Sequence, residues 1–110
     1  MANDSLPTHL WAGAFIRRCS SQGIPVILVN QGEKMGGTVL FKIYQPPDKC
    51  RLLSQIRNFD GQIQWLQAHK EEFIDEVEAS IRIRKAIDRD PDVWVIEVET
   101  KDCNLPFDPV

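Results

Sequence analysis

The segment 93–99, V-W-V-I-E-V-E, lies close to the end of the chain and decides the fold class. Every second side chain points to one face and is apolar: Trp94, Ile96 and Val98. The other face holds Val95 and the two charged residues Glu97 and Glu99. This period of two predicts a β-strand with one drier face. We expect Trp94 to lie in the core on that face.

The segment before this strand predicts a long helix over Glu71–Arg89. Asp90-Pro91 ends it, because the residue before a proline avoids the α region. Acidic residues crowd its start and basic residues crowd its end, an order that complements the helix dipole. The predicted apolar stripe consists of Phe73, Ile74, Val77 and Ile81, extended by Ile83 and Ile87.

Four further segments towards the N-terminus show strand patterns, and a helix precedes them all. The first, 24–30, is a short β-branched run that indicates a buried strand. Residues 38–44 and 50–57 alternate between apolar and polar side chains, which predicts two strands. Residues 62–66 follow the turn signal Asp60-Gly61 and fit the return strand of a hairpin. Residues 7–22 have apolar side chains at helical spacing, with Gly23 placed for a left-handed C-terminal turn.

The predicted fold is an α+β domain with the element order α-β-β-β-(β)-α-β. We expect a mostly antiparallel sheet of four to five strands, with both helices packed on one face. The 110 residues suit a single domain over 1–110. Residues 1–5 and 104–110 are expected to be irregular.

Composition excludes several classes of protein. The apolar content of 43% and net charge of −3 argue against disorder, and no apolar run is long enough to span a bilayer. No signal-peptide pattern opens the chain, so we expect a cytoplasmic protein. Residues 1–57 carry a charge of +4 and residues 58–110 carry −7. The negative net charge of the chain argues against general nucleic-acid binding. RNA binding by the basic N-terminal half is kept as a weaker alternative.

The cysteine and histidine residues predict no disulfide framework, metal site or cofactor. The chain has an odd number of cysteines, which are widely separated: Cys19, Cys50 and Cys103. Neither these cysteines nor His9 and His69 form a closely spaced pair of metal ligands. We therefore expect reduced thiols. Cys19 lies on an apolar helix stripe, and the two histidines are expected at the surface.

Two segments resemble a known family. The first helix has Trp11 followed by Arg17-Arg18, and the closing segment reads D-P-D-V-W-V-I-E-V-E over 90–99. Together they resemble the alphaproteobacterial family called domain of unknown function 1491, whose members have a similar length. The family has no established activity, so the resemblance implies a lineage and assigns no catalytic residue.

Two pairs of charged residues are the candidate binding positions. Glu97 and Glu99 share one strand face and could serve acid–base chemistry or hold a metal, although a solvated strand face explains them too. Arg17 and Arg18 could clamp a phosphate or carboxylate, or simply meet the helix dipole. The nuclease-like pattern PD…ETK over 91–101 is rejected, because one strand would hold its two acidic groups roughly 23 Å apart.

The leading functional hypothesis is a non-enzymatic binding or assembly domain that acts through a protein partner or its own dimer. The alternative is a small enzyme or ligand binder that uses Glu97 and Glu99 with Arg17 and Arg18. The sequence names no catalytic residue and no small-molecule ligand. A cleft that brings these charged groups together would favour the alternative.

Overall fold

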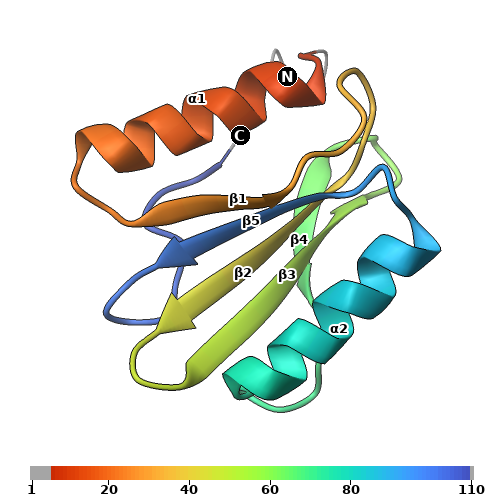
Figure 1. Cartoon of the computed structure of the whole chain (residues 1–110). Helices are drawn as coiled ribbons and strands as arrows, with labels where there is room; N and C mark the ends of the chain where they lie inside the picture. Colours follow the sequence, from red (N-terminus) through yellow and green to blue (C-terminus); the bar gives the residue numbers. More distant parts are fainter. Residues whose placement is uncertain (1–5, 110) are drawn as a thin grey trace.

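The computed structural model describes residues 6–109 and contains two helices and one five-stranded sheet (Figure 1). The elements follow the predicted order: α1 (Thr8–Ser21), β1 (Val26–Asn30), β2 (Val39–Gln45), β3 (Lys49–Arg57), β4 (Ile63–Gln67), α2 (Glu76–Arg89) and β5 (Trp94–Glu99). The hairpin return strand is confirmed as β4. Residues 104–109 belong to no helix or strand, and the predicted irregular residues 1–5 and 110 lie outside the described residues.

The strands are arranged in the order β1-β5-β2-β3-β4. Three of the four pairings are antiparallel, and β2 with β5 is parallel. The parallel pair arises because the chain leaves the β4 edge, runs through α2 and inserts β5 between β1 and β2. A crossover that contains a helix is the usual connection for parallel strands.

The two helices cover opposite faces of the sheet, which corrects the expectation that both lie on one face. Trp11 and Phe15 of α1 pack with Phe41, Trp94 and other residues of one sheet face. The helix α2 packs against the other face, as its ribbon shows (Figure 1). The central strands explain this arrangement: β2 and β5 are apolar on both faces, through residues such as Leu40 and Val95, and both faces need cover.

The second helix is shorter than predicted, and only part of the predicted apolar stripe is buried: Ile74 and Ile83 lie in the core. It begins at Glu76, and the Asp75 side chain caps it by accepting a hydrogen bond from the Glu78 backbone N–H at 2.8 Å. The buried residues are Ala79 and Ile83. The predicted stripe residues Val77 and Ile81 are instead 70% and 45% exposed. Phe73 and Ile74 precede the helix, and Ile74 forms a β-bridge with Cys50.

The strand β1 lies at the edge of the sheet and is not buried, contrary to expectation. Ile27, Leu28 and Val29 are 56%, 40% and 43% exposed. A run of β-branched residues is found in both central and edge strands, so it does not predict the position of a strand in the sheet. Gly23 has a φ of 72°, as the left-handed turn after α1 requires. Neither helix in residues 6–109 has the length and apolar character that crossing a membrane demands.

Candidate functional site at the β1 edge

The edge strand β1 is uncharged and mostly apolar, and it pairs with β5 on one side only. Its other side is a free edge of the sheet. The Pro25 carbonyl accepts a hydrogen bond from the Glu99 backbone N–H at 3.0 Å. Backbone groups alternate in direction along an antiparallel strand, so Ile27 faces β5 while Val26 and Leu28 direct their N–H and C=O groups outward. A bulge at Val29 shifts the register beyond Leu28. The open hydrogen-bonding edge is therefore centred on residues 26–28.

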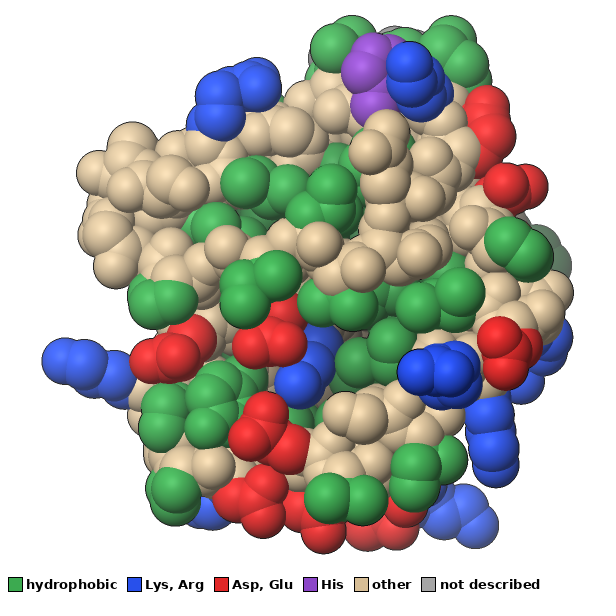
Figure 2. Space-filling view, viewed as in Figure 1, with side chains coloured by type: hydrophobic (Ala, Val, Ile, Leu, Met, Phe, Trp, Pro, Cys, Tyr) green, Lys and Arg blue, Asp and Glu red, His purple; other side chains and the backbone are tan. Residues whose placement is uncertain are grey.

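A groove of about 300 Å³ runs beside this edge, between β1 and α2. Its lining includes Val29 from the edge strand, Arg84 from the helix, and Lys42 and Glu97 from the sheet. Figure 2 shows hydrophobic side chains gathered along the line of β1, with acidic and basic side chains beside them on the α2 side. The edge and the groove form one continuous surface that joins apolar and charged groups.

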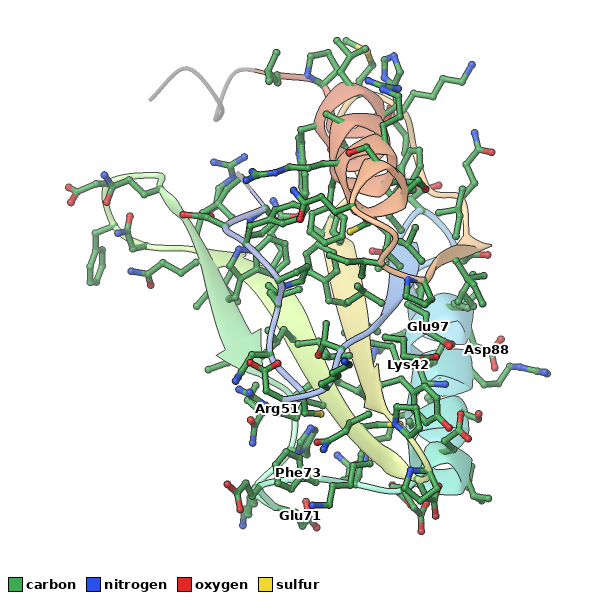
Figure 3. All side chains as sticks on the ribbon, turned by 90° about the vertical axis from the view of Figure 1, so that its left-hand side faces the viewer. Lys42, Arg51, Glu71, Phe73, Asp88 and Glu97 are labelled. Carbon is green, nitrogen blue, oxygen red and sulfur yellow. The ribbon has the colours of Figure 1, made fainter. Side chains whose placement is uncertain are left out.

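Lys42 is a buried cation held between the sheet and α2. Its side chain is 8% exposed, and its Nζ lies 3.1 Å from Glu97 Oε1 and 3.4 Å from Glu76 Oε1. Figure 3 shows Lys42 and Glu97 next to each other beside the helix. Lys42 and Glu97 are paired across β2 and β5 and share a face. This ion pair therefore ties the central strands to the start of α2.

The surroundings of Lys42 and Cys50 keep the lysine charged and the thiol protonated at neutral pH. Burial alone would lower the pKa of Lys42, but the hydrogen bond that its ammonium group donates to Glu97 and the negative charges around it raise the pKa. Burial raises the pKa of the Cys50 thiol to about 11, and the neighbouring Lys42 only partly opposes this. Burial likewise raises the pKa of Cys19 and of Cys103. None of the three thiols is activated as a nucleophile.

The four predicted binding residues do not form one site. Glu97 and Glu99 lie on the α2 face of the sheet, where Glu97 pairs with Lys42 and Glu99 stands beside Tyr44 in register. Arg17 and Arg18 belong to α1, which covers the opposite face. The Arg18 guanidinium lies 3.9 Å from the centre of the Phe107 ring and holds the C-terminal tail. The sheet thus separates the two pairs.

The surface position predicted for His69 is wrong. Its side chain is buried, with only 9% of the residue exposed. Its Nε2 accepts a hydrogen bond from the Leu52 backbone N–H at 3.1 Å, and its Nδ1 lies 2.8 Å from the Glu71 carbonyl oxygen. These partners assign the proton to Nδ1 and make His69 a structural link between β3 and the segment before α2. In residues 6–109, no group of three or more His, Cys, Asp or Glu side chains is arranged to hold a metal ion.

Lys42 and the β1 edge were not among the positions predicted from the sequence. A lysine between Leu40 and Tyr44 on one face of a strand that is otherwise apolar was the available signal, because an inward-facing lysine needs an acidic partner. Glu97, which interrupts the apolar β5 in the same way, was the matching partner.

Comparison with protein families gives one match: the family described as protein of unknown function (DUF1491) matches residues 6–108. The chain belongs to the DUF1491 family. The resemblance seen in the sequence is therefore confirmed. No curated protein matches the chain.

Solved structures of other proteins share the fold. A crystal structure of a DUF1491 family protein from Caulobacter crescentus is 30% identical, with a TM-score of 0.79 over 90% of this chain and 92% of that one. An NMR structure of a DUF1491 protein from the same organism is 29% identical, with a TM-score of 0.80 over 92% of this chain and 91% of that one. A solution structure of protein Atu0922 from A. tumefaciens, 16% identical over 87% of this chain and 86% of that one, has a TM-score of 0.72 and shares the fold.

Proposed function

We propose that the protein is a non-enzymatic assembly domain that associates with a second copy of itself through the free edge of β1. The observation that carries this proposal is the exposed run Ile27, Leu28 and Val29 on an edge strand. Proteins usually protect such edges with charges, prolines or a covering element, because an open apolar edge pairs with other strands. The bulge at Val29 protects only one end of β1.

A second copy is the partner whose chemistry suits this edge. The partner strand must be short, uncharged and apolar on both of its faces, because Ile27 and Leu28 point to opposite faces and are both exposed. The segment V-I-L-V-N of β1 itself meets all three requirements. Flexible peptide segments are usually too polar to do so.

Antiparallel pairing about a two-fold axis gives a defined register. The outward backbone groups of Val26 face those of Leu28 in the second copy, and each such pair exchanges two hydrogen bonds. Ile27 then faces its own counterpart as a non-hydrogen-bonded pair, with Cα atoms about 4.5 Å apart. The two sheets join into one continuous sheet. An interface confined to so few residues is small, so we expect a reversible dimer with a dissociation constant in the range of about 10–100 µM.

The described side chains support a binding role better than a catalytic one. The thiols are buried with raised pKa values, Lys42 is engaged by two carboxylates, and the sheet separates Arg17 and Arg18 from Glu97. The cysteines Cys19, Cys50 and Cys103 are free and buried, which fits the reducing conditions of the cytoplasm.

The proposed register is tested by disulfide trapping with Ile27→Cys. The expected Cα separation of about 4.5 Å lies within the range that a disulfide spans. Leu28→Cys is the matched control, because Leu28 is also exposed but lies diagonal to its counterpart, about 7–8 Å away. The native cysteines do not interfere, since all three are 0% exposed.

Under mild oxidation we expect Ile27→Cys to form a disulfide-linked dimer on non-reducing gels, with little dimer for Leu28→Cys. Equal cross-linking of the two variants would indicate random collision or another register. Absence of cross-linking in both, at concentrations well above the expected dissociation constant, would contradict the dimer.

A further inference from the structure

A second groove lies on the opposite flank of α2, and it leaves part of the sheet uncovered. A helix is about 10 Å wide, whereas five strands span roughly 19 Å, so one helix covers only about half of a sheet face. On this face α2 covers the region of Leu40, Leu52 and Val95. The β3–β4 region beyond it retains two exposed apolar side chains, Ile56 (38%) and Leu66 (55%).

The apolar floor of this groove comes from β3 and β4. Leu52 and Ser54 belong to β3, and Leu66 pairs directly with Ser54, so their side chains share the α2 face. A cavity of about 400 Å³ is lined by Leu52, Ser54 and Ala68 together with α2. An adjoining cavity of about 580 Å³ shares Ala68 and Arg82 with it and continues past Leu66. The groove is therefore elongated along the side of the helix.

The wall of the groove on α2 is basic. Arg82, Lys85 and Arg89 line it at helical spacing, together with the acidic Glu78. Arg82 is held in place, because its Nε donates to Glu78 Oε2 at 2.7 Å and its Nη1 donates to the Ala68 carbonyl at 3.2 Å. Lys85 and Arg89 are exposed and form no ion pair with an acidic side chain of residues 6–109. Two cations thus face the groove without a counter-charge.

We propose that this groove binds an acidic amphipathic helix of a partner protein. An apolar floor beside a basic wall matches a helix with one apolar and one acidic face. The elongated shape favours a peptide over a compact small molecule. The available length is that of α2, 14 residues or about 21 Å. This surface is separate from the β1 edge, so it adds a partner site to the assembly domain without depending on the dimer.

The test uses a fluorescein-labelled, lactam-stapled peptide of about 14 residues, with leucine along one face and glutamate on the other, in fluorescence anisotropy titrations. Lys85→Glu is the test variant. Arg84→Glu is the matched control, because Arg84 is the adjacent cation on the same helix but lines the groove on the β1 side. A second peptide carries lysine in place of every glutamate, and an oligoglutamate peptide lacks the leucine face.

We expect the acidic amphipathic peptide to bind the wild type with a dissociation constant of about 10–100 µM. Lys85→Glu should weaken binding about tenfold, and Arg84→Glu should change it less than about twofold. The lysine peptide and oligoglutamate should bind at least about tenfold more weakly. Ile27→Lys should bind the peptide like the wild type, which separates failure of this proposal from failure of the dimer.

Three results would overturn the proposal. Absence of saturable binding up to about 1 mM peptide excludes the site. Equal losses in Lys85→Glu and Arg84→Glu mean that the peptide responds to overall charge alone. Displacement of the peptide by a short oligouridylate, or equal binding of oligoglutamate, assigns the groove to a general polyanion and not to an amphipathic helix.

Discussion

Replacing Trp94 with alanine removes the largest side chain that β5 contributes to the core. Trp94 is 4% exposed and packs with α1 and β2 in the core on the α1 face. Its indole Nε1 donates to the Glu33 carbonyl oxygen at 2.7 Å, which ties the turn after β1 to the sheet. The substitution therefore empties a core site and frees that turn.

The expected loss follows from the buried surface. A buried aromatic side chain removes roughly 150–250 Å² from water, which is about 4–6 kcal/mol as an upper estimate. Measured truncations of buried Phe and Trp cost about 3–5 kcal/mol. The lost hydrogen bond adds only about 1 kcal/mol, because water can reach the Glu33 carbonyl in its exposed turn. We expect about 4–6 kcal/mol in total. A domain of this length has about 5–15 kcal/mol of stability, so Trp94→Ala removes a large part of it.

Urea denaturation followed by far-UV circular dichroism measures this loss. Trp94→Phe is the comparison: it keeps an aromatic ring in the core but loses the hydrogen bond, and should cost about 1–2 kcal/mol. A soluble Trp94→Ala protein less than about 1.5 kcal/mol below the wild type would refute the assignment of the indole to the core.

Three further predictions concern backbone packing, the buried ion pair and alkaline pH. Gly32→Ala should destabilise the protein strongly in thermal melting, because an added Cβ would come within 2.8 Å of the Trp94 backbone nitrogen and closer still to the Asp92 carbonyl; an unchanged melting temperature would contradict this packing. Lys42→Ala should cost about 2–4 kcal/mol in urea denaturation, because it leaves Glu97 without its cation, and Glu97→Gln added to it should restore part of the loss; strictly additive losses would argue against coupling. Burial raises the pKa of Cys50 to about 11 from the ordinary 9.0, so its contribution to stability is fully present below pH 9 and is lost as pH rises to 11. The melting temperature should therefore fall less steeply over this pH range for Cys50→Ala than for the wild type. Identical slopes of melting temperature against pH would contradict the assignment.

The order of elements could be predicted from the sequence because alternation and turn residues are local signals. The segments around Trp94 and Phe41 alternate clearly, and both became central strands. Placement of the helices could not be predicted in the same way. The apolar residues Leu40 and Val95 on the second face of β2 and β5 did indicate that both faces of the sheet must be covered, but the prediction rested only on the drier face of each strand.

The remaining errors come from tertiary contacts that leave weak local signals. Val77 and Ile81 have helical spacing but face solvent, because α2 packs against the sheet through Ala79 and Ile83. The prediction of a shared site for the arginine and glutamate pairs was wrong for a similar reason, because it too depended on tertiary contacts. Charge alone does not say that the sheet separates Arg17 from Glu97, because that separation depends on which face each helix covers.

Sedimentation velocity over a concentration series, from about 10 to 500 µM, tests self-association through β1 most directly. Two edge-strand variants make a matched pair: Ile27→Lys on β1 and Leu66→Lys on β4, at positions 56% and 55% exposed. We expect the weight-average sedimentation coefficient to rise with concentration for the wild type and for Leu66→Lys, but to stay at the monomer value for Ile27→Lys. A wild type that remains monomeric throughout the series, or an Ile27→Lys protein that dimerises like the wild type, would contradict association through this edge.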